Sequence, residues 1–514
     1  MNNKQNEKWN PDENTREFMA RKDHFFHACG DYPNRISGEL LRQYEIPARS
    51  GMVGSYGSPA GISRAFADMA WVVMLYEQEL IPLDTAQKLL IALEEAKNDS
   101  TYWGEDWLRN YFNGDERIAS SVNLGRTLQE PMSRIQLRNR SIEFFDVALD
   151  TMSFLLDYAK EKRDLVFAAH THMSQAQPTT YGAYLAAIFD ALLRGMEEVE
   201  TGYRHTNISS AGCGALEGSG WPVDRKMVAD LLGFDGIIGS SYDCEAGQDY
   251  ATSLLFGLTS IAVVMSRTSM DHEIWGTDEI GYFRVNGCVA GPSSLMPQKA
   301  HAGGELEKVR FYSNDVMNAL HRALLSLKGE PYEDILPIYQ AWGAAESGLY
   351  LSMLTFRLFR AYLENIQFNK ERMLKTAAEG YSCMPDMAVY LIKNRGLAGR
   401  HAHRICATTT FLARKKGIKG NEITPELMNE ALELNQDPLR DLLTLEEIRE
   451  CLDPVKSILR HNNIGDPHPD EVLRQIEERR GQLAQFRARQ EERKAKLKQG
   501  DDLLNGRIKA ILEA

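Results

Sequence analysis

The sequence predicts an all-α protein, and two observations carry that prediction. Apolar residues recur at helical spacing through most of the chain, whereas the alternation typical of half-buried strands is scarce. Three long segments, 133–161, 181–204 and 248–274, contain few helix-breaking residues, and the last is apolar nearly all round. Because a helix of that composition is buried among other helices, we expect a helical bundle.

Further helices and breaks follow along the chain. Asp84 precedes a run of apolar residues at helical spacing, which predicts an N-cap and an amphipathic helix. The charge-rich tail 469–499 favours a solvated terminal helix over an interaction arm. Breaking residues cluster at 218–222, at 233–236 and above all at 287–304. A glycine- and proline-bearing stretch of that last length between helices is more often functional than a passive connector.

Size, charge and cysteine usage narrow the class of protein. The chain of 514 residues suffices for about three domains, and 43% hydrophobic with 25% charged residues excludes disorder. The net charge of −13 disfavours nucleic acid as a partner. Seven scattered cysteines without a CxxC pair indicate reduced thiols and argue against structural zinc.

Neither the N-terminal residues nor the most apolar stretch indicates a membrane. The N-terminal residues MNNKQNEKWNPDENTREF lack the apolar segment of a secretory signal. The longest apolar stretch, 251–265, is interrupted by hydroxyl residues and is shorter than the roughly 20 residues that a membrane span needs. We therefore expect a cytoplasmic protein with no membrane association.

Three polar segments are candidates for chemistry. The stretch 287–304 contains the adjacent hydroxyls of Ser293 and Ser294 and then Lys299 and His301, although by composition alone it fits a polar surface loop better than a catalytic one. Upstream, 171–178 leads into a helix that we expect to start near Pro178. Its polar residues then either face a ligand at the positive end of the helix dipole or serve as caps around a hydrogen-bonded histidine.

The third polar segment, 119–131, precedes the first long helix and contains Arg126. The Arg126 guanidinium either forms a bidentate pair with a substrate carboxylate or pairs with Glu130 on the surface.

Together these segments resemble the fumarase/aspartase superfamily, in its argininosuccinate lyase-like branch. Ser-Ser-Leu-Met-Pro-Gln-Lys at 293–299 is similar to the superfamily signature GSSxMPxKxN. Thr-His at 171–172 with Ala-Gln-Pro at 176–178 resembles the second region of that family, and Gly-Arg-Thr at 125–127 resembles the first. The similarity runs from about residue 118 to about residue 475.

The resemblance implies a three-domain, almost wholly helical subunit. We expect an N-terminal helical domain at 1–118, a central helix bundle at 119–374 that carries the signature loop, and a C-terminal helical domain at 375–514. It also implies a homotetramer in which each active site gathers the three regions from three different subunits. Superfamily enzymes cleave a C–N or C–O bond of a succinyl-type substrate by anti elimination, and we expect no cofactor and no metal.

The resemblance also assigns roles to residues. An elimination next to a carboxylate needs a base and donors for the developing negative charge. Ser293 is the expected base, and Lys299 either holds it as an alkoxide or contacts the substrate carboxylate. His172 polarises the substrate or protonates the departing nitrogen, with Glu307 orienting its ring. Because Glu307 lies one residue farther from Ser293 than in the family, Glu305 is the alternative. The other residues assigned to substrate binding are Ser294, His301, Thr171, Arg126, Thr127, Gln129 and Gln177.

Departures from the family pattern bear on the substrate. His301 replaces the usual asparagine, and Leu128 replaces an arginine of the first region. Where argininosuccinate lyases recognise the arginine end, this chain has Asp334, Pro337 and Tyr339.

We therefore expect a C–N lyase that eliminates an amine from an N-substituted aspartate, such as an aminopolycarboxylate of the ethylenediamine-disuccinate type, to give fumarate, or that catalyses the reverse addition. The alternatives are an argininosuccinate lyase, a nitrosuccinate-type lyase, a cycloisomerase and a catalytically silent structural paralogue.

Overall fold

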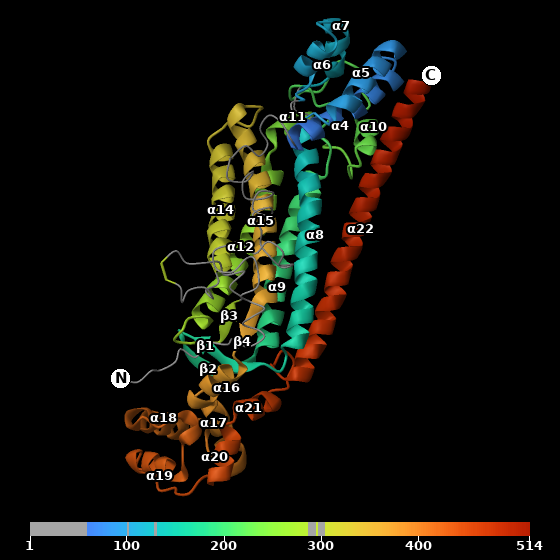
Figure 1. Ribbon diagram of the computed structural model, residues 1–514. Coiled ribbons are helices and arrows are strands. Elements are labelled where there is room, and N and C mark those ends of the chain that lie inside the picture. The colour runs from blue at the N-terminus through green and yellow to red at the C-terminus, as the bar shows by residue number, and fades with distance from the viewer. Residues whose placement is uncertain (1–58, 100–101, 128–130, 286–294, 297–303) are drawn as a thin grey trace, which may run out of the picture.

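The computed structural model describes residues 59–99, 102–127, 131–285, 295–296 and 304–514, and these residues form a helical protein (Figure 1). The strands among them make only two small antiparallel sheets, β1–β2 and β3–β4. The predicted all-α class is therefore confirmed. The predicted domain boundaries stay a prediction.

Five long helices form the central bundle and run side by side (Figure 1). The three long segments expected from the sequence are helices α8, α9 and α12, with boundaries that agree to within two residues. The bounds of the bundle helices are α8 Met132–Glu161, α9 Tyr181–Thr206, α12 Asp249–Trp275, α14 Gly304–Lys328 and α15 Tyr339–Asn365.

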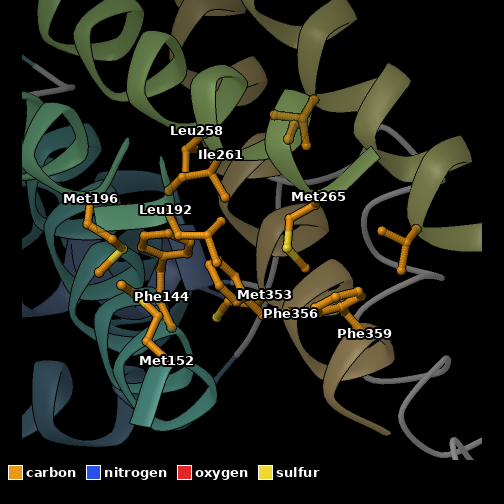
Figure 2. Close-up of a cluster of buried hydrophobic side chains, with 14 of the residues drawn as sticks. Phe144, Met152, Leu192, Met196, Leu258, Ile261, Met265, Met353, Phe356 and Phe359 are labelled. Atoms are coloured by element: carbon orange, nitrogen blue, oxygen red, sulfur yellow. The ribbon is translucent and has the colours of Figure 1, made fainter. Parts of the chain in front are cut away.

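The core of the bundle is built from apolar side chains of several helices. Phe144, Leu192, Ile261 and Phe356, from α8, α9, α12 and α15, are all fully buried, and Figure 2 shows them gathered in one cluster. Tight interhelical packing of this kind is what holds a bundle together, because each helix buries its apolar stripe against its neighbours.

Glycines bring α9 and α12 into unusually close contact. A Cβ added at Gly202 would lie 2.5 Å from the backbone nitrogen of Leu254, and one at Gly257 would lie 2.4 Å from that of Val199. Any larger side chain at Gly202 or Gly257 would therefore force the two backbones apart.

Helix α12 is the one helix in the described ranges that is long and apolar enough to cross a membrane by length and composition. It contacts α9, α14 and α15, and half of its most apolar window is buried within this single chain. Its composition is thus accounted for by its place in the bundle.

Short helices cover the end of the bundle where α8 begins (Figure 1). They are α4 Pro59–Glu77, α5 Leu83–Ala96, α6 Glu105–Tyr111, α7 Glu116–Ala119, η2 Ser120–Asn123, α10 Arg225–Leu231 and α11 Ser241–Ala246. The helix expected after Asp84 is α5, but the expected N-cap is wrong. Pro82 occupies the N-cap position without a side-chain hydrogen bond, and Asp84 lies in the first turn, where it pairs with Lys88 at 2.9 Å.

The opposite end of the bundle carries the two sheets and a second group of short helices (Figure 1). The strands are β1 Val166–Thr171, β2 Ser174–Thr180, β3 Phe283–Val285 and β4 Ile366–Phe368. Because β4 follows α15 directly, η4 Leu336–Ile338, which precedes α15, lies at the other end of that helix. The helices are α16 Lys370–Glu379, α17 Met384–Arg395, α18 Gly399–Lys416, η5 Gly420–Glu422, α19 Pro425–Leu434, α20 Leu445–Cys451 and α21 Pro454–Arg460. Helices α17 to α20 enclose a hydrophobic cluster of their own.

The chain ends in α22, Pro469–Glu513, a helix of 45 residues that runs along the outside of the bundle (Figure 1). The sequence predicts a solvated helix here, and the structure corrects that expectation. Val472, Ile476, Leu483 and Phe486 are buried against the bundle because their spacing places them on one face of the helix. Charged side chains of α22 also form ion pairs with the bundle, such as Arg489 with Glu200 at 2.8 Å.

Candidate active site

The segment 171–178, which resembles the second region of the family, lies in a β-hairpin. Strands β1 and β2 pair antiparallel with Thr171 opposite Ser174, and Pro178 lies within β2 opposite Ala168. The helix start expected near Pro178 is therefore wrong. Helix α9 starts at Tyr181, where the Thr180 hydroxyl accepts a hydrogen bond from the Ala183 N–H at 3.2 Å. A proline is tolerated in β2 because each strand of a two-stranded sheet has one unpaired edge.

The turn of this hairpin consists of His172 and Met173, whose φ angles are +50° and +58°. Two-residue hairpin turns require this left-handed backbone, which glycine, asparagine and to a lesser degree histidine adopt more readily than methionine. Backbone strain of this kind is concentrated at functional sites. The side chains of Thr171, His172 and Gln177 are exposed, so the hairpin presents them outward from its own subunit.

Arg126, in the first region, forms an ion pair with Asp68 of α4. Its side chain is only 1% exposed and lies over the Trp71 ring, with 5.3 Å between the guanidinium carbon and the ring centroid. Arg126 thus pairs with a carboxylate that the sequence did not point to. Glu130 itself lies outside the described residues.

Asp68 is the centre of this buried charge cluster. It is fully buried, and it also accepts hydrogen bonds from Arg64 Nε, at 3.1 Å, and from the Tyr102 hydroxyl. Burial raises the pKa of Asp68, but the charges of Arg126 and Arg64 and the hydrogen bonds outweigh burial, so that the net pKa is lowered. Arg126 Nε and Nη1 are buried and have no hydrogen-bond partner among the described residues.

The two candidate carboxylates at the start of α14 differ in environment. Glu307 is exposed. Glu305 is 6% exposed, and its Oε2 has no hydrogen-bond partner in the part of the chain that the structure describes. Burial raises the pKa of Glu305 to about 6, with Lys308 opposing that shift. Of the two, Glu305 therefore has the environment of a proton-exchanging carboxyl group at neutral pH.

The remaining predicted site residues, Ser293, Ser294, Lys299, His301 and Gln129, lie outside the described residues. The others do not converge within one chain. Arg126 and Thr127 precede α8, whereas Thr171, His172 and Gln177 follow it at the opposite end of the bundle (Figure 1). Since α8 has 30 residues, it separates the two groups by about 45 Å.

A pocket that sequence reasoning missed adjoins the β1–β2 hairpin. It has a volume of about 480 Å³ and is lined by residues of the hairpin, α9 and α12, among them Met173, His170 and Asp271. Two signals in the sequence point to it in retrospect. His170 lies two residues before His172, and Asp271 is a charged residue near the end of the most apolar helix.

Comparisons with known proteins agree on the class. A family model described as "Lyase" matches residues 117–301. Argininosuccinate lyase of Methanothrix thermoacetophila is 29% identical over 84% of this chain and 89% of its own length. The argininosuccinate lyase of Methanocaldococcus jannaschii is 25% identical over 85% of this chain and 91% of its own length.

Solved structures give the same result. A variant of EDDS lyase with bound fumarate superposes with a TM-score of 0.83 at 26% identity, covering 93% of this chain and 96% of that one. Class II fumarase of Schistosoma mansoni shares the fold, with a TM-score of 0.63 at 15% identity over 82% of this chain and 95% of that one.

The fold and these similarities define a carbon–nitrogen lyase. The chain belongs to the fumarase/aspartase superfamily, in its argininosuccinate lyase-like branch.

Proposed function

We propose that this lyase eliminates an amine from an N-substituted aspartate to give fumarate, or adds the amine to fumarate in the reverse direction. The similarity to EDDS lyase over 93% of the chain supports this substrate class. We place the reaction in the cytoplasm, in keeping with the absence of disulfides among the five cysteines of the described residues.

The observation that carries the substrate proposal is the hydrogen bond between Tyr339 and Asp334. Asp334 is the one carboxylate at the positions where the resemblance expects arginine recognition, and its Oδ1 accepts a hydrogen bond from the Tyr339 hydroxyl. A guanidinium needs a planar bidentate acceptor. The Tyr339 hydroxyl takes one acceptor position of the one carboxylate at these positions, and Pro337 and Tyr339 supply no second carboxylate there to hold a guanidinium, which disfavours argininosuccinate.

In the proposed reaction Ser293, held as an alkoxide by Lys299, removes the proton from the carbon next to a carboxylate. The electron pair left on that carbon forms the double bond of fumarate as the C–N bond breaks, and the departing nitrogen takes a proton from His172. Ser294, Thr171, Thr127, Gln129, Gln177 and His301 donate hydrogen bonds to the substrate carboxylates. We assign the role of orienting His172 to Glu307 or, in view of its burial, to Glu305.

We further propose that the enzyme is a homotetramer with each site shared between three subunits. The separation of the regions along α8 requires such an arrangement if one site uses both. Helix α12 exposes Phe256, Val263 and Met270 at seven-residue intervals, which is the spacing of a helix–helix seam. Helix α14 also exposes large apolar side chains, namely Phe311, Met317, Leu324 and Leu325. An apolar surface of this extent marks an association site.

The test is fumarate release, followed by ultraviolet absorbance, from a panel that includes ethylenediamine-disuccinate, argininosuccinate and aspartate, with Ser293→Ala as the inactive control. We expect the highest kcat/KM on a substituted aspartate other than argininosuccinate. Argininosuccinate as the best substrate would establish the second candidate function, which the named relatives favour. No fumarate from any substituted aspartate would contradict both.

A further inference from the structure

The pocket beside the β1–β2 hairpin has aromatic walls. Phe167 of β1, Tyr184 of α9 and Trp275 of α12 line it, and the segment before α22 contributes Gly465 and Pro467. Its volume of about 480 Å³ falls within the range of small-molecule sites.

Asp271 gives this pocket its charge. It is the one carboxylate among the lining residues, and its Oδ2 accepts a hydrogen bond from the Tyr184 hydroxyl at 2.9 Å. None of the ion pairs in the described ranges involves Asp271. The exposed Arg267, one turn earlier on α12, acts on it only at longer range and does not line the pocket.

His170 does not neutralise this charge at neutral pH. Burial lowers the pKa of the His170 imidazole, so that the ring is mainly uncharged near pH 7. Burial also raises the pKa of Asp271, because water hydrates the ionised carboxylate poorly at this position. The pocket thus combines a carboxylate that forms no ion pair among the described residues with aromatic side chains.

An organic ammonium ion fits this combination. The carboxylate attracts the ammonium group, and aromatic faces stabilise cations at close range. A dicarboxylate such as fumarate would instead be repelled. The pocket also lies next to the candidate site, because Met173, which lines it, adjoins His172 in the hairpin turn.

We propose that this pocket binds the amine half of the substrate, with Asp271 as the acceptor for an ammonium group and Phe167, Tyr184 and Trp275 as its walls. This inference rests on the proposed function, since it assigns a place to the amine that the reaction releases. It makes Asp271 a specificity-determining residue.

The test measures binding of benzylamine, which is protonated at pH 7.5, to the full-length enzyme by titration calorimetry, with benzyl alcohol as the uncharged analogue. We expect benzylamine to bind and Asp271→Asn to raise its Kd at least tenfold. Asp164→Asn is the matched control, because Asp164 lies just before the same hairpin and its side chain is 64% exposed. Equal Kd values for benzylamine and benzyl alcohol, or a Kd unchanged by Asp271→Asn, would overturn the inference.

A second variant covers the case in which Asp271→Asn fails to fold. Met173 is 77% exposed, so Met173→Lys places a cation at the pocket without disturbing the core. We expect Met173→Lys to weaken benzylamine binding at least tenfold and Met173→Gln to leave it within threefold. Equal effects of the two substitutions would contradict the inference.

Catalysis provides an independent readout. In Asp271→Asn we expect the KM for ethylenediamine-disuccinate to rise at least tenfold while inhibition by fumarate is unchanged. If the enzyme released no fumarate but bound benzylamine through Asp271, the proposed function would fail and the ammonium site would stand. If it released fumarate but bound benzylamine independently of Asp271, only the ammonium site would fail.

Discussion

Arg126 precedes helix α8 and His172 follows it, so that the full length of the helix, about 45 Å, lies between the two regions that carry them. Both regions belong to the candidate active site. If the two regions serve one active site, as we propose, a single subunit does not assemble that site and neighbouring copies of the chain complete it.

Asp68→Asn should destabilise the fold. The substitution leaves the buried guanidinium groups of Arg64 and Arg126 without their carboxylate, and breaking a buried ion pair in this way costs about 3–5 kcal/mol. Urea denaturation at constant subunit concentration measures the loss. Asp84→Asn, which breaks an exposed pair with Lys88, is the control and should cost less than about 1 kcal/mol. Similar losses in the two variants would contradict the proposed role of Asp68.

The Asp68 carboxylate should also make the free energy of unfolding depend on pH. Because the net pKa of Asp68 is lowered in the folded state, its contribution is fully present above the ordinary pKa of 3.8. It is lost as the pH falls through the lower folded-state value. Wild type and Asp68→Asn should therefore converge in stability only in strong acid.

Glu346→Gln should stabilise the enzyme above neutral pH. Glu346 is fully buried on α15, 3.8 Å from Arg140 Nε, and burial raises its pKa to about 7. Because this pKa lies above the ordinary value of 4.5, the folded state binds a proton between the two values, and the free energy of unfolding falls as the pH rises through that window.

Glutamine mimics the protonated acid, so the variant escapes this loss. Urea denaturation should show a gain of about 3 kcal/mol at pH 8 and almost none at pH 4.5. Glu143→Gln, at a half-exposed carboxylate that also pairs with Arg140, is the matched control. A lower stability of Glu346→Gln at pH 8 would show that the ionised carboxylate is needed.

The long helices of the bundle could be predicted from the local sequence pattern, whereas the geometry of the candidate site could not. Helices α8, α9 and α12 follow from unbroken helical periodicity. The hairpin at His172 does not, because two short strands on either side of a two-residue turn leave too little alternation to detect. Asp68 could not be paired with Arg126 in advance, since the two residues are brought together only by tertiary packing.

Ser293→Ala should abolish turnover and leave the fold intact. The substitution removes the expected base, so we predict a loss of several orders of magnitude in kcat, with unchanged circular dichroism. Ser294→Ala should cost less because that hydroxyl only donates a hydrogen bond. Retention of more than about a tenth of wild-type activity in Ser293→Ala, or roughly 1.4 kcal/mol of barrier, would exclude Ser293 as the base.

Argininosuccinate should be a poor substrate. Loss of the arginine contacts leaves a guanidinium poorly compensated, at a cost of roughly 2–5 kcal/mol. We therefore predict a kcat/KM at least about a hundredfold below that of the best substituted aspartate. A kcat/KM of about 10⁴ M⁻¹s⁻¹ or more on argininosuccinate would contradict this prediction and identify the enzyme as an argininosuccinate lyase.

Complementation between inactive variants tests most directly whether the site is shared between subunits. Ser293→Ala and His172→Ala are each expected to be inactive, and a site that takes Ser293 and His172 from different subunits escapes both lesions in a quarter of random assemblies. Unfolding, mixing in equal amounts and refolding the two variants should thus restore up to about a quarter of wild-type fumarate release, in particles of about four subunits. Mixtures that stay as inactive as either variant alone, or a fully active monomer, would contradict a shared active site.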